Sequence, residues 1–148
     1  MAFDDLVAAT RSAVASRQRS APLRELRERT RSVPTARNVA SVLRAPGRVV
    51  SVIAEVKRAT ATFADLSGVG DVAVLARFYE AGGAACVSVV TEPVRSHGRL
   101  SDLDAVRGAV EVPVLANDVI VTPYQVHEAR AHGADMLVVD ARLEPLVL

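Results

Sequence analysis

The sequence is poor in aromatic residues, in cysteine and in lysine. Its 148 residues include three Phe, two Tyr and no Trp, so it offers no platform on which nucleobases could stack. Cys86 is the one cysteine, so no disulfide can form within the chain, as is usual in a reducing compartment. The 18 basic residues are 17 arginines and Lys57. A lysine that persists against this bias can mark a need for a compact ammonium, although chance is a serious rival explanation.

The sequence also lacks a strong charge of either sign and long apolar runs. A formal net charge of +1, with both signs interspersed, creates no field that would attract a polyanion. The apolar runs fall far short of the roughly 20 residues that a membrane-spanning helix needs. The first residues, MAFDDLVAAT, carry two acids and lack the basic segment and apolar core of a signal peptide. We therefore expect a cytoplasmic protein with no nucleic-acid partner and no membrane partner.

Half of the residues are apolar, enough for one compact core, and their spacing changes near residue 45. Up to residue 44 they recur at helical spacing, and prolines divide this stretch into three predicted helices. Beyond it, short apolar runs typical of strands buried on both faces alternate with helical segments. The sequence thus predicts an N-terminal helical extension over 1–44 and a second unit over 45–148. The predicted strands cover 49–56, 85–90, 112–115 and 136–139, and the helices between them cover 72–82, 103–110 and 124–133.

Strands that alternate with helices in this way predict an α/β fold with a parallel sheet and right-handed crossovers. In such folds, chemistry takes place on the loops at the carboxyl ends of the strands. Glu55 and Lys57, two residues apart, point to the same face of their strand. On spacing alone, a simple ion pair is the favoured interpretation of these two. The residues expected at this rim are Glu55, Lys57, Thr91, Glu92, Asn117, Asp118, Asp140 and Arg142.

Other chemistry-bearing residues give weaker signals. His97, His127, His132 and Cys86 lack the spacing of a metal site, so no metal is expected. Cys86 lies in an apolar run, which favours a small core residue over a nucleophile. Two of the histidines are expected on a helix surface, and Arg142 is expected to be a solvated charge rather than an anion contact.

Three segments resemble indole-3-glycerol-phosphate synthase, an enzyme family of tryptophan biosynthesis. They are VIAEVKRAT, ARFYEAGGAACVSVVTEP and HGRLSDLDAVRGAVEVPVLANDVIVTPYQVHEARAHGADMLVV. The similarity runs in order and with family-like spacing from the N-terminal helices to about residue 143. The resemblance implies a (β/α)8 barrel (a TIM barrel) with an N-terminal helical extension.

The resemblance also implies an activity. The family closes an indole ring on 1-(2-carboxyphenylamino)-1-deoxyribulose 5-phosphate, with loss of CO2 and then of water, and it requires no cofactor. Glu55 and Lys57 match the E-x-K motif of the family's first strand. The resemblance implies that Lys57 engages the anionic groups of the substrate and supports acid chemistry. It implies that Glu55 assists proton transfer and orientation.

The rim motifs depart from the family pattern. Asn117 stands where the family carries the lysine that is its principal general acid, and an amide does not titrate near neutral pH. Thr60 keeps a hydroxyl in a loop whose family proline and lysine are absent. Ser96 stands where the family carries an aromatic residue against the anthranilate ring. We expect Thr60, Glu92 and Ser96 to be substrate-binding positions, and Asn117 to be a catalytic position without acid function.

The family takes further catalytic groups and its phosphate-binding loops from strands five to eight, and residues 1–148 resemble its first four strands. We therefore expect an incomplete (βα)4 half-barrel, a truncated or degenerate homologue that is weak or inactive as an isolated chain. An alternative is a non-catalytic half-barrel that self-associates as a homo-oligomer, or pairs with a complementary barrel fragment or a full-length paralogue. A weaker alternative is a binder of small phosphorylated sugars.

Overall fold

The computed structural model describes residues 2–44, 47, 50–60 and 70–143, and these form N-terminal helices followed by a parallel sheet with crossover helices. The N-terminal helices are α1 (Phe3–Ser20), α2 (Leu23–Ser32) and α3 (Val39–Leu43). Strands and crossover helices follow in alternation. They are β1 (Ile53–Val56), α4 (Val72–Ala81), β2 (Cys86–Val90), α5 (Leu100–Ala109), β3 (Val114–Asn117), α6 (Pro123–Ala131) and β4 (Met136–Leu137).

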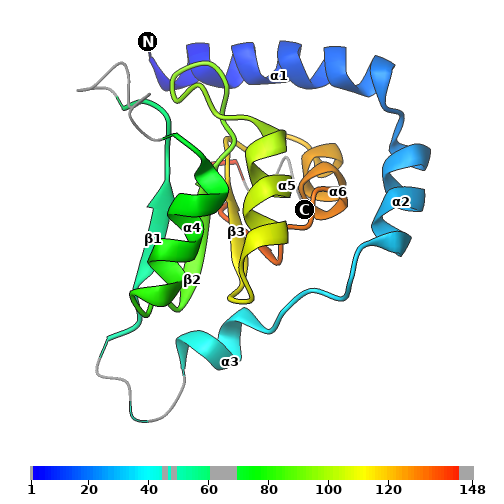
Figure 1. The fold of residues 1–148 in the computed structure, drawn as a ribbon. Coiled ribbons are helices and arrows are strands. Elements are labelled where there is room, and N and C mark those ends of the chain that lie inside the picture. The colour runs from blue at the N-terminus through cyan, green and yellow to red at the C-terminus, as the bar shows by residue number, and fades with distance from the viewer. Residues whose placement is uncertain (1, 45–46, 48–49, 61–69, 144–148) are drawn as a thin grey trace.

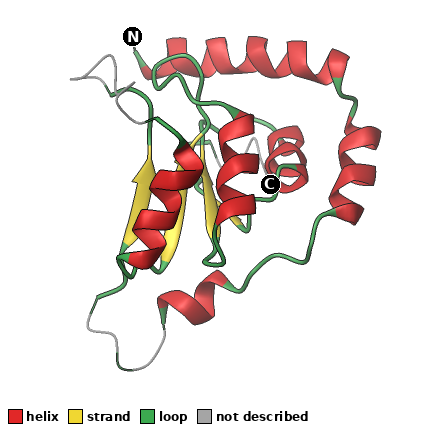
Figure 2. Cartoon of the chain, viewed as in Figure 1, coloured by secondary structure: helices red, strands yellow, loops and turns green. Residues whose placement is uncertain are grey.

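The four described strands lie in chain order, β1-β2-β3-β4, and each adjacent pair is parallel (Figure 1). The crossover helices α4 and α5 cover one face of the sheet (Figure 2). This arrangement is an α/β half-barrel with an N-terminal helical extension, and it confirms the fold class expected from the sequence.

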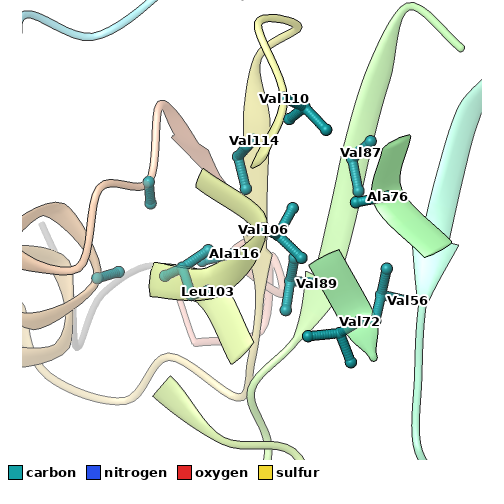
Figure 3. Packing of buried hydrophobic residues seen from close by; sticks show 12 residues of the cluster. Val56, Val72, Ala76, Val87, Val89, Leu103, Val106, Val110, Val114 and Ala116 are labelled. Atoms are coloured by element: carbon teal, nitrogen blue, oxygen red, sulfur yellow. The ribbon is translucent and has the colours of Figure 1, made fainter. Parts of the chain in front are cut away.

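The core lies between the sheet and the crossover helices (Figure 3). Each strand contributes alternate residues, because successive side chains of a strand point to opposite faces. β-branched valines suit this position, since a branched side chain packs well against a pleated surface. The central members are Val56, Val87, Val89, Val114 and Ala116 from the strands, and Val72, Ala76, Leu103 and Val106 from α4 and α5.

The helices α1 and α2 pack mainly on α6, whereas α3 contacts β2. A second buried cluster joins Val14 of α1 and Leu26 of α2 to Tyr124 and Ala131. The Tyr124 hydroxyl donates a hydrogen bond to the carbonyl of Ala21 at 2.9 Å, which satisfies its polar end. In Figure 1, α1 runs along the end of the molecule toward which β1 points, and α2 descends beside α6.

The boundaries differ from the prediction mainly at the edges of the sheet. The expected strand 49–56 is shortened to β1, with residue 49 outside the described residues, and the expected strand 136–139 is shortened to β4. The prediction that every strand is buried on both faces is wrong for β1, where Ile53 is 42% exposed, because β1 has a described neighbour on one side only. Within the described residues, no helix combines the length and the apolar character needed to cross a membrane.

A polar network ties the amino ends of the strands together. The fully buried Asp135 carboxylate accepts hydrogen bonds from Arg107 at 3.0 Å and from the backbone N–H groups of Val114 and Arg37, each at 2.9 Å. Burial lowers the pKa of Arg107, and the charge of Asp135 opposes this effect. Gly133, at φ +87°, leaves space for the Arg107 side chain, since a Cβ there would lie 2.6 Å from Arg107 Cγ.

We predict that Asp135→Ala lowers the free energy of unfolding by about 3–5 kcal/mol, because it leaves the largely buried Arg107 without its counter-charge. Urea denaturation followed by circular dichroism measures the change. Asp104→Ala is the matched control, since Asp104 is half exposed and its removal should cost at most about 1 kcal/mol. Equal losses in the two variants would contradict a special role for Asp135.

Candidate functional site

The face of the sheet opposite the crossover helices carries polar residues toward its carboxyl end. Because Val56, Val89 and Ala116 point toward the helices, the alternate residues Glu55 and Asn117 point the other way. Glu55 lies opposite Ser88 of β2, and Asn117 lies opposite Val90, so both flank the same strand. Parallel pairing thus brings together two side chains that are 62 residues apart in the sequence.

Glu55 bridges two donors. Its Oε1 accepts a hydrogen bond from Nδ2 of Asn117 at 3.0 Å, and its Oε2 lies 3.8 Å from Nζ of Lys57. The Glu55 and Lys57 side chains are 39% and 31% exposed, so a solvent-borne ligand can reach them. The three predicted catalytic residues therefore form one contiguous group. Their contact with each other is what the structure shows, and their catalytic roles stay predictions.

Arg58, directly after Lys57, holds the end of β1 in place. Its guanidinium makes two hydrogen bonds to the buried Asp102 of α5, at 2.6 and 2.7 Å. A paired guanidinium–carboxylate fork of this kind fixes orientation as well as charge. The sequence analysis did not single out this pair, and a basic residue beside an E-x-K motif is too weak a signal to find it.

The loop after β2 folds around the Glu92 carboxylate. This buried group accepts hydrogen bonds from the backbone N–H groups of Val94, Arg95 and Ser96. Gly98 closes the loop against β2, where a Cβ would lie 2.3 Å from the carbonyl oxygen of Val90. Glu92 and Ser96 thus lie at the expected end of the sheet, with the carboxylate turned into its own loop. Their predicted roles in substrate binding stay predictions.

Asp118 is a second carboxylate at the rim and is partly buried. Its Oδ2 accepts a hydrogen bond from the Thr91 hydroxyl at 3.0 Å, and its Oδ1 accepts one from the Val119 N–H at 2.7 Å. Burial is the largest influence on this group and raises its pKa to about 6. The two hydrogen bonds and the charge of Arg17 act in the opposite direction, whereas the nearby Glu92 raises the pKa further.

The connection from β3 to α6 is held by side chains on both sides. Gln125, 2% exposed, accepts from the Val121 N–H at 2.8 Å and donates to the Val119 carbonyl at 2.9 Å. These two hydrogen bonds fix Gln125 at the start of α6. Arg17 of α1 makes two hydrogen bonds to Glu128 of α6, at 2.8 and 2.9 Å. No local pattern could reveal that pair, because 111 residues separate its members.

The remaining candidates lie around this rim. Thr60 is half-buried beyond β1, next to residues 61–69, which are outside the described residues and include part of the family loop motif. The Arg142 side chain is 66% exposed, as expected for a solvated charge, and it also pairs with Asp140 at 2.6 Å and lies 3.7 Å from the centroid of the Phe3 ring. Within the described residues, no group of three or more His, Cys, Asp or Glu side chains could hold a metal ion.

The parallel α/β half-barrel, with Glu55, Lys57 and Asn117 at the carboxyl ends of its strands, places the chain in the (β/α)8-barrel class of folds. A model of the family "Indole-3-glycerol phosphate synthase" matches residues 3–145. The chain therefore belongs to the indole-3-glycerol phosphate synthase family, which confirms the resemblance seen in its motifs.

Curated relatives of the same description support this assignment. The indole-3-glycerol phosphate synthase of Mycolicibacterium smegmatis is 51% identical over 135 residues, 91% of this chain and 49% of the relative. That of Mycolicibacterium vanbaalenii is 49% identical over 147 residues, 99% of this chain and 53% of the relative. The chain thus spans about half the length of the curated relatives it matches.

We predict that the ionisation of Asp118 makes the fold less stable as pH rises. The folded state holds this proton to about pH 6, whereas an unfolded aspartate releases it near pH 3.9. The stabilisation is therefore complete below about pH 4 and is lost as pH rises through 6, a change of about 3 kcal/mol. Asp118→Asn should remove this loss, so its advantage over the parent should grow from pH 4 to pH 6.5 in urea denaturation.

Asp4→Asn provides the control, because it makes the same change at an exposed carboxylate of α1. Its stability relative to the parent should stay level over this pH range. If Asp118→Asn also stays level, Asp118 is ionised throughout and the prediction is wrong.

Proposed function

We propose that the chain carries one wall of an indole-3-glycerol phosphate synthase active site. This wall is the part of the site that the first four strands of the family's barrel build. We further propose that residues 1–148 by themselves turn over substrate weakly or not at all. The substrate class is that of the family, 1-(2-carboxyphenylamino)-1-deoxyribulose 5-phosphate, and the pathway is tryptophan biosynthesis. The observation that carries the proposal is the group formed by Glu55, Lys57 and Asn117 on the open face of the sheet.

Lys57 is the proton donor and electrostatic anchor of this wall. Its ammonium lies within reach of solvent, so it can meet a carboxylate or phosphate of the substrate and give a proton to a departing hydroxyl. Glu55 orients that ammonium from 3.8 Å and offers the carboxylate that can take a proton in return. Ring closure with loss of CO2 and water needs such transfers, because water leaves only after an oxygen has been protonated.

Asn117 limits what this wall can do. Its amide donates a hydrogen bond to Glu55, which fixes the carboxylate, but an amide cannot release a proton near neutral pH. The resemblance places a lysine ammonium at this position in the family. The chain therefore keeps one of the two ammonium groups, that of Lys57. The absence of the second ammonium at position 117 supports weak turnover independently of how many strands are present.

A second candidate function is that of a non-catalytic half-barrel subunit, and the exposed strand edges favour it. Val52 and Ile53 at β1 are 54% and 42% exposed, and Val138 and Val139 beyond β4 are 43% and 37% exposed. Apolar strand edges are templates for pairing with another chain. A complementary barrel fragment or a full-length paralogue could cover them, and such a subunit would act through its partner's site.

We predict that Asn117→Lys raises turnover of the carboxyphenylamino-deoxyribulose phosphate at least tenfold over the parent chain, because it restores a titratable acid beside Glu55. Lys57→Ala in that background should remove the gain and weaken binding of the substrate analogue whose ketone is reduced. Indole fluorescence measures product formation, and titration calorimetry measures binding of the analogue.

Arg29→Ala is the control for loss of one positive charge, since Arg29 lies exposed on α2, away from the strands. It should leave binding unchanged, whereas Lys57→Arg should keep binding and lose turnover. If the parent chain turns over substrate at the rate of a full-length relative, and if Lys57→Ala abolishes this turnover, then residues 1–148 suffice for catalysis. The proposal of weak turnover would then be wrong. Equal analogue binding with and without Lys57 would refute the assigned site.

A further inference from the structure

A cavity of about 630 Å³ lies at the amino end of the sheet, opposite the end that carries Glu55 and Lys57. One wall is the segment that joins α2 to α3, and the other walls are the last turns of α5 and α6, at Gly108 and Ala131 (Figure 1). Pockets that hold small molecules measure about 300–1,000 Å³, so this cavity is large enough for one.

Gly108 keeps the cavity open. It lies inside α5, where glycine is less favourable than alanine because it loses more backbone freedom on folding. A Cβ at this position would meet no described atom within 4 Å, so close packing does not require a glycine there. Because Gly108 lines the cavity, a side chain at this position would occupy part of the space that a ligand could fill.

The cavity is lined by groups of both charges. Arg37 and Arg107 contribute guanidinium groups, and Asp104 and Glu111 contribute carboxylates. Arg107 is bound to the fully buried Asp135 at 3.0 Å, so it is committed to the fold. Nη2 of Arg37 is instead bound to Glu111 at 3.3 Å, and the Glu111 side chain is 96% exposed, which makes this pair weak and exchangeable. Arg37 is therefore the group that can receive the carboxylate of a ligand.

Other parts of the lining favour a cation. The carbonyl ends of α5 and α6 meet the cavity at Gly108 and Ala131, and the carbonyl groups that end a helix carry partial negative charge. The Asp104 side chain is 51% exposed beside them. Glu111 becomes a second acceptor once a ligand has replaced it on Arg37. A ligand that carries a carboxylate and an ammonium close together would satisfy both sets of groups.

We propose that this cavity binds a free α-amino acid with an apolar side chain. Its carboxylate takes the place of Glu111 on Arg37, its ammonium lies among Glu111, Asp104 and the helix ends, and its side chain packs on Val33 and Pro34. A zwitterion adds no net charge, so the balance of charges around the cavity is kept. The bound amino acid joins the N-terminal extension to α5 and α6, and the proposal does not depend on the proposed activity.

Titration calorimetry of the purified chain with L-leucine, L-phenylalanine and L-tryptophan at millimolar concentrations tests the proposal. We expect at least one of them to bind saturably, one molecule per chain, and to raise Tm because it binds the folded state. Failure of all three to bind would overturn the proposal. Because no ring-closing substrate is used, either outcome leaves the turnover predictions untouched.

Derivatives of the amino acid that binds test the need for both charges. The N-acetyl derivative lacks the ammonium and the amide derivative lacks the carboxylate. Each should bind at least about tenfold more weakly, since each loses a charge-assisted hydrogen bond. If either derivative binds as tightly as the free amino acid, the cavity does not recognise a zwitterion and the proposal is wrong.

Gly108→Leu places an apolar side chain in the cavity without touching a charged group, so it should abolish binding while circular dichroism stays that of the parent. Gly70→Leu is the matched control, because Gly70 is exposed before α4, away from the cavity, and also has free space for a Cβ. This variant should bind as the parent does. Unchanged binding by folded Gly108→Leu would place the ligand elsewhere and would overturn the proposal.

Glu111→Gln provides a test that does not alter the shape of the cavity. The side chain is exposed, so the variant should fold as the parent does, yet it loses the carboxylate that receives the ammonium. We expect the amino acid to bind several-fold more weakly. Binding equal to that of the parent would contradict the role given to Glu111 in the proposal.

Discussion

Parallel pairing of the strands is the constraint on which the rest of this structure depends. Because every strand runs the same way, each connection must cross over the sheet, and α4 and α5 cover one face together. The valine-rich core packs on that face, and the Glu55 and Asn117 side chains point from the other face. The carboxyl ends of all the strands then meet at one rim. The candidate site is thus a consequence of strand direction combined with the alternation of side chains.

Two charged networks occupy opposite ends of the sheet and have different characters. At the amino ends, the buried Asp135 is saturated by Arg107 and two backbone N–H groups, which fits a purely stabilising role. At the carboxyl ends, Glu55 and Lys57 lie 3.8 Å apart and partly exposed, and Asp118 is held with a raised pKa of about 6. The first network rigidifies the scaffold, whereas the second leaves the Glu55 and Lys57 side chains within reach of solvent. In barrel folds this division separates the stability face from the chemical face.

The architecture could be predicted from the sequence because the period of apolar residues changes sharply near residue 45 and turn signals mark the boundaries. Asp71, for example, stands directly before α4 and caps it by accepting hydrogen bonds from the N–H groups of Ala73 and Val74. The grouping of Glu55, Lys57 and Asn117 was also predictable, since it follows from strand order. The ion pairs Arg58–Asp102 and Arg17–Glu128 could not be predicted from the sequence, because an ion pair between distant residues leaves no periodic pattern in it. The exposure of β1 escaped prediction as well, since an apolar run reads the same at the edge of a sheet as in its centre.

The contact between Arg17 and Glu128 has a consequence for the order in which the molecule can be built. During synthesis α1 is made before α6, and the ion-pair partner of Arg17 follows 111 residues later. At typical translation rates, that interval lasts on the order of ten seconds. Throughout it, Val14 of α1 has no α6 on which to dock. Helix α1 is therefore complete long before the residues that fix its position have been made.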